Sequence, residues 1–187
     1  HRIEIYGLTE KPGELEEMFG GCKPSDGSDA DFLTENKRLI MRDWEESFAK
    51  PIAEVEGKIG QSAGGSKSPI MAAIQNIKLR VLDRFKDQPI RKKMIVLSDM
   101  IEHTEHYSQY RSGSDFAAFK ASSASREYRT DLSGINVEFW FIDRGIAQFS
   151  GVEHQTFWAN WVRTNHGNFE RSINLEGLNP QGSSGAN

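Results

Sequence analysis

The sequence has little cysteine, no long apolar run and no surplus of basic residues, and each of these features excludes a class of protein. Its one cysteine, Cys22, cannot form an internal disulfide, which fits a reducing compartment such as the cytoplasm without establishing it. No apolar run approaches the roughly 18 residues of a membrane span. The net charge is −4, so nothing in the composition points to nucleic acid as a partner.

The remaining composition is typical of a globular chain. Of the 187 residues, 37% are hydrophobic and 27% are charged, which suffices for one domain with a core. We expect a single domain over residues 1–178 and a disordered tail over residues 179–187, where Gly, Ser, Asn and Pro dominate. The chain does not begin with a signal-peptide pattern, so a cytoplasmic location is slightly favoured. A secreted or periplasmic location is the alternative if a secretion signal lies upstream.

Apolar spacing predicts an alternation of strands and helices. Strand patterns cover residues 2–8, the segment that ends at Asp99, and residues 134–142 and 168–175. Helical patterns cover residues 34–59 with a kink or break at Pro51, residues 69–85, the surroundings of Phe116 and Phe119, and residues 152–167 closed by Gly167. Residues 9–33 are expected to form a long loop. Such alternation predicts an α/β fold, a three-layer sandwich with a mostly parallel central sheet.

Two oxygen-bearing side chains are the strongest candidates for chemistry. Asp99 follows the unbroken apolar run 94–97, a pattern typical of a strand covered on both faces, and ligands gather beyond the carboxyl ends of such strands. Its carboxylate could coordinate a divalent cation, or it could merely cap a helix or anchor a loop. Ser68 ends a Gly-rich turn before Pro69, so its hydroxyl either caps a helix or supplies a hard oxygen ligand for Mg²⁺ or Mn²⁺.

The order of these motifs resembles a known family. "SAGGSKSPIMAAI" followed about 30 residues later by "MIVLSDMIEH" is similar to the von Willebrand factor A (VWA) domain of bacterial proteins. The resemblance implies a metal-ion-dependent adhesion site with Ser68 and Asp99 at the matching positions, Mg²⁺ or Mn²⁺ as the ion, and a protein partner that contributes an acidic residue.

One departure from the family concerns its first strand, which ends in D-x-S-x-S. This chain has no such motif after an apolar strand, and Asp26 and Ser28 match only part of it behind the loop-like "FGGCKP". Either the first strand lies upstream of this chain or the metal site is degenerate. We favour the upstream strand, because a parallel sheet that lacks a central strand would expose two edges.

Two other functions remain open. His103 and His106 could join Asp99 in a metal-dependent hydrolase or phosphoesterase, although no third His or Cys completes a zinc spacing. A metal-free scaffold is the third interpretation, with Ser68 capping a helix. Because no nucleophile or general base is evident, the sequence favours a binding module. The aromatic residues of 157–161 are expected mainly in the core, with one exposed tryptophan at an interface as the alternative.

Overall fold

A computed structural model describes residues 1–11, 13–31, 34–61 and 66–175. Contacts divide the chain into two compact units, one formed by His1–Thr9 with Leu15–Ser66 and the other by Glu10–Glu14 with Lys67–Asn187. A single domain over residues 1–178 stays a prediction. The tail 179–187 lies outside the described residues. In the described part of the chain, no helix is long and apolar enough to cross a membrane.

The first unit begins with an antiparallel hairpin. Strand β1 (Arg2–Leu8) pairs with β2 (Leu15–Cys22), with Leu8 opposite Leu15. A loop over residues 9–33 was expected, and this prediction was wrong for β2. The segment LEEMFGGC contains two glycines and two glutamates, which have low strand propensity, so its pairing with β1 determines its conformation. Cys22, at the end of β2, is exposed.

A helical segment follows in the same unit. It consists of α1 (Lys37–Trp44), a π-helical turn over Glu45–Ala49, and α2 (Lys50–Gln61). The expected kink or break at Pro51 is replaced by this turn, in which the Lys50 amide donates to the Glu45 carbonyl, five residues back. Because Pro51 has no amide hydrogen and its ring crowds the preceding turn, the wider π-turn lets the helix continue. The Phe48 ring packs edge-to-face on Phe19 of β2, with centroids 5.8 Å apart.

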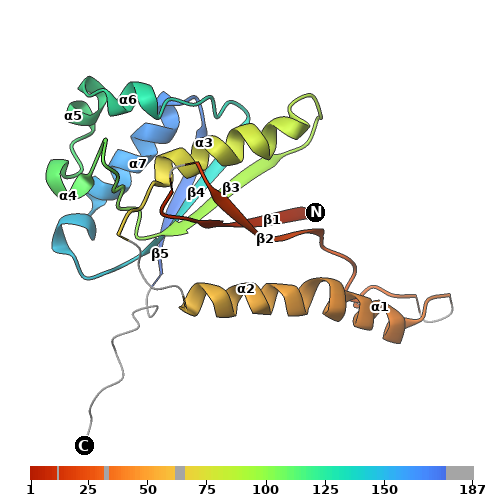
Figure 1. Cartoon of the computed structure of the whole chain (residues 1–187). Helices are drawn as coiled ribbons and strands as arrows, with labels where there is room; N and C mark the ends of the chain where they lie inside the picture. Colours follow the sequence, from red (N-terminus) through yellow and green to blue (C-terminus); the bar gives the residue numbers. More distant parts are fainter. Residues whose placement is uncertain (12, 32–33, 62–65, 176–187) are drawn as a thin grey trace, which may run out of the picture. The chain divides into compact units, whose positions relative to one another are not determined.

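The second unit contains a parallel sheet, as predicted, but it has only three of the four predicted strands, because residues 2–8 form β1 of the antiparallel hairpin instead. Strands β3 (Lys92–Ser98), β4 (Ile135–Ile142) and β5 (Asn168–Leu175) lie in the order β3-β4-β5, and both pairs are parallel (Figure 1). The chain is thus a mixed α/β protein that also has an antiparallel hairpin. The helices of this unit are α3 (Ile70–Arg80), α4 (Gln109–Ser112), α5 (Phe116–Ala121), α6 (Ala124–Glu127) and α7 (Val152–Thr164), with 3₁₀ turns over Leu82–Phe85 and Ala147–Phe149.

One face of the sheet forms the core with α3 and α7. Val137, Phe139 and Phe141 alternate along β4 toward this face and are buried with the apolar side chains of both helices. The sequence predicted that β3 would be covered on both faces. The opposite face is instead partly exposed, since Ile95 and Leu97 of β3 are 47% and 39% exposed. The unbroken apolar run therefore predicts the strand correctly but not its burial.

A buried carboxylate links the three strands on that opposite face. The side chain of Glu138 in β4 is only 3% exposed and accepts hydrogen bonds from Lys93 of β3 (2.7 Å) and Arg171 of β5 (2.9 Å). The hydrogen bond from Lys93 contributes most to lowering the pKa of Glu138 to about 2. Glu138 is therefore ionised at neutral pH and holds one cation from each neighbouring strand.

The aromatic residues of α7 all belong to the core. Trp158 packs on Phe139 of the sheet, with ring centroids 5.7 Å apart, whereas Phe157 contacts Phe116 and Phe119 of α5. Trp161 lies against Trp158 and is 1% exposed. The core interpretation is therefore confirmed, because α7 lies between the sheet and α5 and is enclosed on several sides.

The end of α7 differs from the prediction that Gly167 would take the left-handed position. His166 adopts a positive φ of 61°, and the Gly167 amide donates to the Val162 carbonyl at 2.9 Å. Gly167 is needed for another reason. A Cβ atom at this residue would lie 2.7 Å from Val162 Cγ1 and 2.9 Å from Leu132 Cβ, so the backbone passes too close to the core for a side chain.

Replacement of Gly167 by alanine should therefore destabilise the protein by about 1–3 kcal/mol, the usual cost of overpacking. Urea unfolding followed by circular dichroism measures the change. Gly151→Ala is the matched control, because a Cβ there meets nothing within 4 Å in the described structure and φ is −97°. Equal stability of the two variants would contradict this account of Gly167.

Candidate functional site

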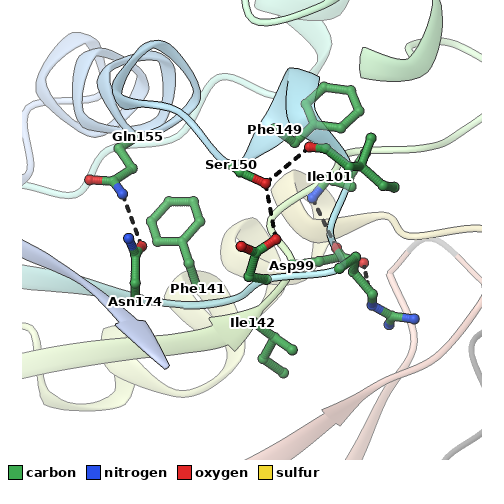
Figure 2. A pocket seen from close by; sticks show the side chains of 11 residues that line it. Asp99, Ile101, Phe141, Ile142, Phe149, Ser150, Gln155 and Asn174 are labelled. Carbon is green, nitrogen blue, oxygen red and sulfur yellow. Dashed lines mark hydrogen bonds and ion pairs between the residues drawn. The ribbon is translucent and has the colours of Figure 1, made fainter. Parts of the chain in front are cut away.

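A pocket lies at the carboxyl edge of the parallel sheet, where the ends of its three strands meet. Asp99 follows β3, Phe141 and Ile142 end β4, and Asn174 lies near the end of β5 (Figure 2). Because the three strands are parallel, their carboxyl ends lie at the same edge of the sheet, and the residues that end or follow them lie close together. The segment after β4 and the start of α7 complete the lining with Asp143, Arg144, Ile146, Phe149, Ser150 and Gln155, while Ile101 comes from the segment after β3.

The two oxygens of Asp99 have different partners. Oδ1 accepts a hydrogen bond from the Ile101 amide at 3.0 Å, which closes the turn after β3. Oδ2 lies 3.2 Å from Nε of Arg144, in the segment after β4. The Asp99 side chain is 16% exposed and the Arg144 side chain 52% exposed, so the ion pair faces solvent mainly on the arginine side. Oδ1 thus binds the local backbone, whereas a ligand can bind Oδ2 only if it displaces Arg144.

Helix α7 holds the turn that carries Asp99. Met100 adopts a positive φ of 58°, and its carbonyl accepts a 2.7 Å hydrogen bond from Nε1 of Trp158. His154 is fully buried, with Nε2 3.4 Å from the Asp99 carbonyl and Nδ1 3.1 Å from the Ser114 hydroxyl. Burial lowers the pKa of His154, so the ring is neutral at pH 7. A carbonyl can only accept, so Nε2 carries the proton and Nδ1 accepts from Ser114.

Asp143 supplies a second carboxylate to the pocket. Its Oδ1 accepts from the Gly145 amide at 2.7 Å and from the Ser150 hydroxyl at 3.0 Å, as part of the loop between β4 and α7. The charged side chains among the lining residues are therefore Asp99, Asp143 and Arg144. Two carboxylates against one guanidinium give a net charge of −1, which favours a cation as the bound species.

Ser68 does not cap the following helix. Its amide donates to the His103 carbonyl at 2.8 Å and its carbonyl accepts from the His103 amide at 3.0 Å, so the two residues form an antiparallel bridge. The bridge ties Ser68 to the fourth residue after Asp99. Ser68 is not among the residues that line the pocket. A shared role for Ser68 and Asp99 stays a prediction.

A residue that the sequence reasoning missed, Glu102, takes the capping role instead. Its fully buried carboxylate accepts a hydrogen bond from the Met71 amide in the first turn of α3 at 2.8 Å. Burial is the main cause that raises the pKa of Glu102 to about 8, against the lowering effect of the Met71 and Ile70 amides. The side chain of Gln109 in turn binds the Glu102 amide at 2.8 Å. Five of the eight residues 102–109 are buried, and the polarity of this segment gives no signal of that burial. They are Glu102, Thr104, Tyr107, Ser108 and Gln109.

The histidines proposed as alternative ligands have other partners. Nδ1 of His103 lies 2.9 Å from the Ser108 hydroxyl, and Nδ1 of His106 lies 3.5 Å from Oε2 of Glu127. Neither residue lines the pocket with Asp99. Across the described ranges, no group of three or more His, Cys, Asp or Glu side chains is arranged to hold a metal ion. This arrangement offers no support for a zinc site or a metallohydrolase that uses these histidines.

The partial D-x-S match is a local turn. Oδ1 of Asp26 accepts hydrogen bonds from the amide and the hydroxyl of Ser28, at 2.9 and 2.6 Å. This is the geometry of a turn in which aspartate caps its own backbone. Both side chains are thus bonded within the turn, and the interpretation that Asp26 and Ser28 do not supply the missing motif stays a prediction.

Comparisons of the chain with protein-family models, with curated proteins and with solved structures each returned no match. The resemblance to the VWA domain therefore rests on the order and spacing of the motifs in this sequence.

Proposed function

We propose that this chain is a VWA-like protein-interaction module that binds a divalent cation at the carboxyl edge of its parallel sheet and presents it to an acidic residue of a protein partner. One observation carries the proposal. Asp99 directly follows β3 and lies at a pocket that the ends of all three parallel strands line, and two carboxylates against one guanidinium give this pocket a net negative charge.

The ligand chemistry agrees with Mg²⁺ or Mn²⁺. Both ions prefer hard oxygen ligands and retain several waters, so one or two protein carboxylates and a hydroxyl suffice on the protein side. Asp99 provides the carboxylate. Ser68 would provide a hydroxyl, and its backbone is bridged to His103 in the segment after Asp99. Water molecules and a partner's carboxylate would complete the shell.

The proposal includes the finer fold assignment. In a three-layer VWA-like sandwich, a further strand would lie beside β3, and further helices would cover the sheet face on which Ile95 and Leu97 lie. The exposure of these two apolar side chains, at 47% and 39%, supports such a cover.

Isothermal titration of the chain with Mg²⁺ and Mn²⁺ tests the metal part of the proposal. We expect saturable binding that weakens at least about tenfold in Asp99→Asn and in Ser68→Ala, because each removes an oxygen ligand. Asn at residue 99 keeps the Oδ1 acceptor for the Ile101 amide, so the turn is retained. Asp87→Asn is the control, since Asp87 is exposed and outside the pocket. Absence of metal binding, or binding that both site variants leave unchanged, would contradict the proposal.

A further inference from the structure

Arg144 is the positively charged residue of the pocket lining, and the proposed function gives it no contact to the metal ion or to the partner. Its Nε lies 3.2 Å from Oδ2 of Asp99, the oxygen that does not bind the local backbone. The neighbouring Asp143 is turned to Gly145 and Ser150, so the pairing of Arg144 is with Asp99 alone in the described structure. A cation that coordinates Oδ2 of Asp99 must therefore displace this guanidinium.

The displacement requires little free energy. The Arg144 side chain is 52% exposed and makes a single contact to one carboxylate oxygen, and half-exposed ion pairs of this kind are weak. Arg144 also lies on the loop between β4 and α7, where a change of side-chain rotamer disturbs no helix or strand. The released guanidinium would remain at the rim of the pocket, because its backbone stays in place.

Charge determines what the released guanidinium would bind. Without a metal ion the pocket carries −1, from Asp99 and Asp143 against Arg144, and it repels an acidic ligand. A divalent cation changes this sum to +1, with Arg144 no longer neutralised by Asp99. A carboxylate at the rim could then contact the ion with one oxygen and the guanidinium with the other, and guanidinium binds carboxylates through directed N–H donors.

We propose that Arg144 exchanges partners: it pairs with Asp99 in the metal-free protein and with the acidic residue of the partner in the metal-loaded protein. This inference rests on the proposed function and identifies a residue that determines specificity for a carboxylate ligand. It predicts two effects of opposite sign for one substitution. Loss of Arg144 removes a competitor for the metal ion and also removes a contact to the ligand.

The test compares the chain with its Arg144→Gln variant in two titrations. In the first, Mn²⁺ alone is added, and Arg144→Gln should bind it about two- to fivefold more tightly, because half-exposed ion pairs contribute that much. In the second, the Mg²⁺-saturated protein receives the peptide acetyl-Gly-Leu-Asp-Leu-Gly-amide, and Arg144→Gln should bind it at least about fivefold more weakly. The Asn version of the peptide should bind neither protein.

A spectroscopic readout and a control separate this role from a structural one. The side-chain Nε–H resonance of Arg144 should shift on addition of Mg²⁺ and shift again with the Asp peptide. Arg129→Gln removes the same charge from an exposed residue outside the pocket and should change neither titration. If Arg144→Gln weakens both titrations or changes neither while Mn²⁺ still binds the unmodified chain, the exchange is wrong and the metal site stands. If Mn²⁺ does not bind the unmodified chain, the proposed function and the exchange both fail.

Discussion

Replacement of Trp158 by alanine should lower the free energy of unfolding by about 3–5 kcal/mol, the range for deletion of a buried aromatic side chain. Trp158 is fully buried and contacts Phe139 of β4, Phe157 and Trp161, with ring centroids 5.7–5.9 Å away. The truncation would leave a cavity between α7 and the sheet that neighbouring rings cannot fill. Urea unfolding measures the change.

Trp158→Phe tests the hydrogen bond of the Trp158 side chain separately from the volume that this side chain fills. It keeps most of the aromatic packing but leaves the Met100 carbonyl without its 2.7 Å donor, which we expect to cost about 1–3 kcal/mol. Because Met100 lies at a positive φ directly after Asp99, this variant should also broaden or shift the amide resonances of residues 99–101. Val152→Ala, on the same helix at a side chain that is 74% exposed, is the control and should stay within about 0.5 kcal/mol of the unmodified protein. A Trp158→Ala protein as stable as this control would contradict the assignment of Trp158 to the core.

The sequence predicted the elements of the parallel sheet better than their surroundings. The apolar runs of β3 and β4 and the helical spacing of α3 and α7 follow directly from side-chain periodicity, and all four elements were expected near their observed bounds. Strand β2 was missed, because its pairing with β1 and not its composition determines its conformation. Gly167 was assigned the left-handed position that His166 takes, because close packing against Val162 and Leu132 cannot be read from local sequence.

The residues of the candidate site also differ in whether they could be predicted from the sequence. Asp99 could be predicted, because a carboxylate after an apolar strand stands out in the sequence. Arg144 and Glu102 could not, since each acquires its role from a partner in a distant segment: Asp99 for Arg144 and Met71 for Glu102. A polar segment such as 102–109 carries no periodic signal that distinguishes a buried network from an exposed loop. The cap that Glu102 provides was therefore missed, and the position of Ser68 before Pro69 left helix capping as one of its two expected roles.

Glu102 should make the protein less stable as the pH rises from about 4.5 to about 8. In the folded protein the pKa of Glu102 is about 8, mainly because of burial, whereas in the unfolded chain it returns to its ordinary value of 4.5. Between these values the folded state holds a proton that the unfolded state has lost, so the free energy of unfolding falls by at most about 1.4 kcal/mol per pH unit. The contribution is fully present below pH 4.5 and is lost as the pH passes 8.

Glu102→Gln isolates this contribution. The amide is neutral at every pH and keeps an oxygen acceptor for the Met71 amide, so the cap of α3 is retained. Relative to the unmodified protein, the variant should gain stability continuously from pH 5 to pH 8, by at most about 4 kcal/mol over that interval. Urea unfolding at half-unit steps of pH measures the difference. His154, whose pKa is lowered by burial, titrates in both proteins and cancels from this comparison.

Glu105→Gln provides the matched control, three residues away. Glu105 is exposed and pairs with Lys67 at 2.6 Å, which lowers its pKa. A group with a lowered pKa stabilises the fold above its unfolded value and loses that effect only in acid, so the difference between Glu105→Gln and the unmodified protein should be flat from pH 5 to pH 8. Parallel stability curves for Glu102→Gln and the unmodified protein over this range would mean that Glu102 is ionised in the fold. The Met71 amide would then be capped by a buried charge, and burial would not raise the pKa of Glu102 in the fold.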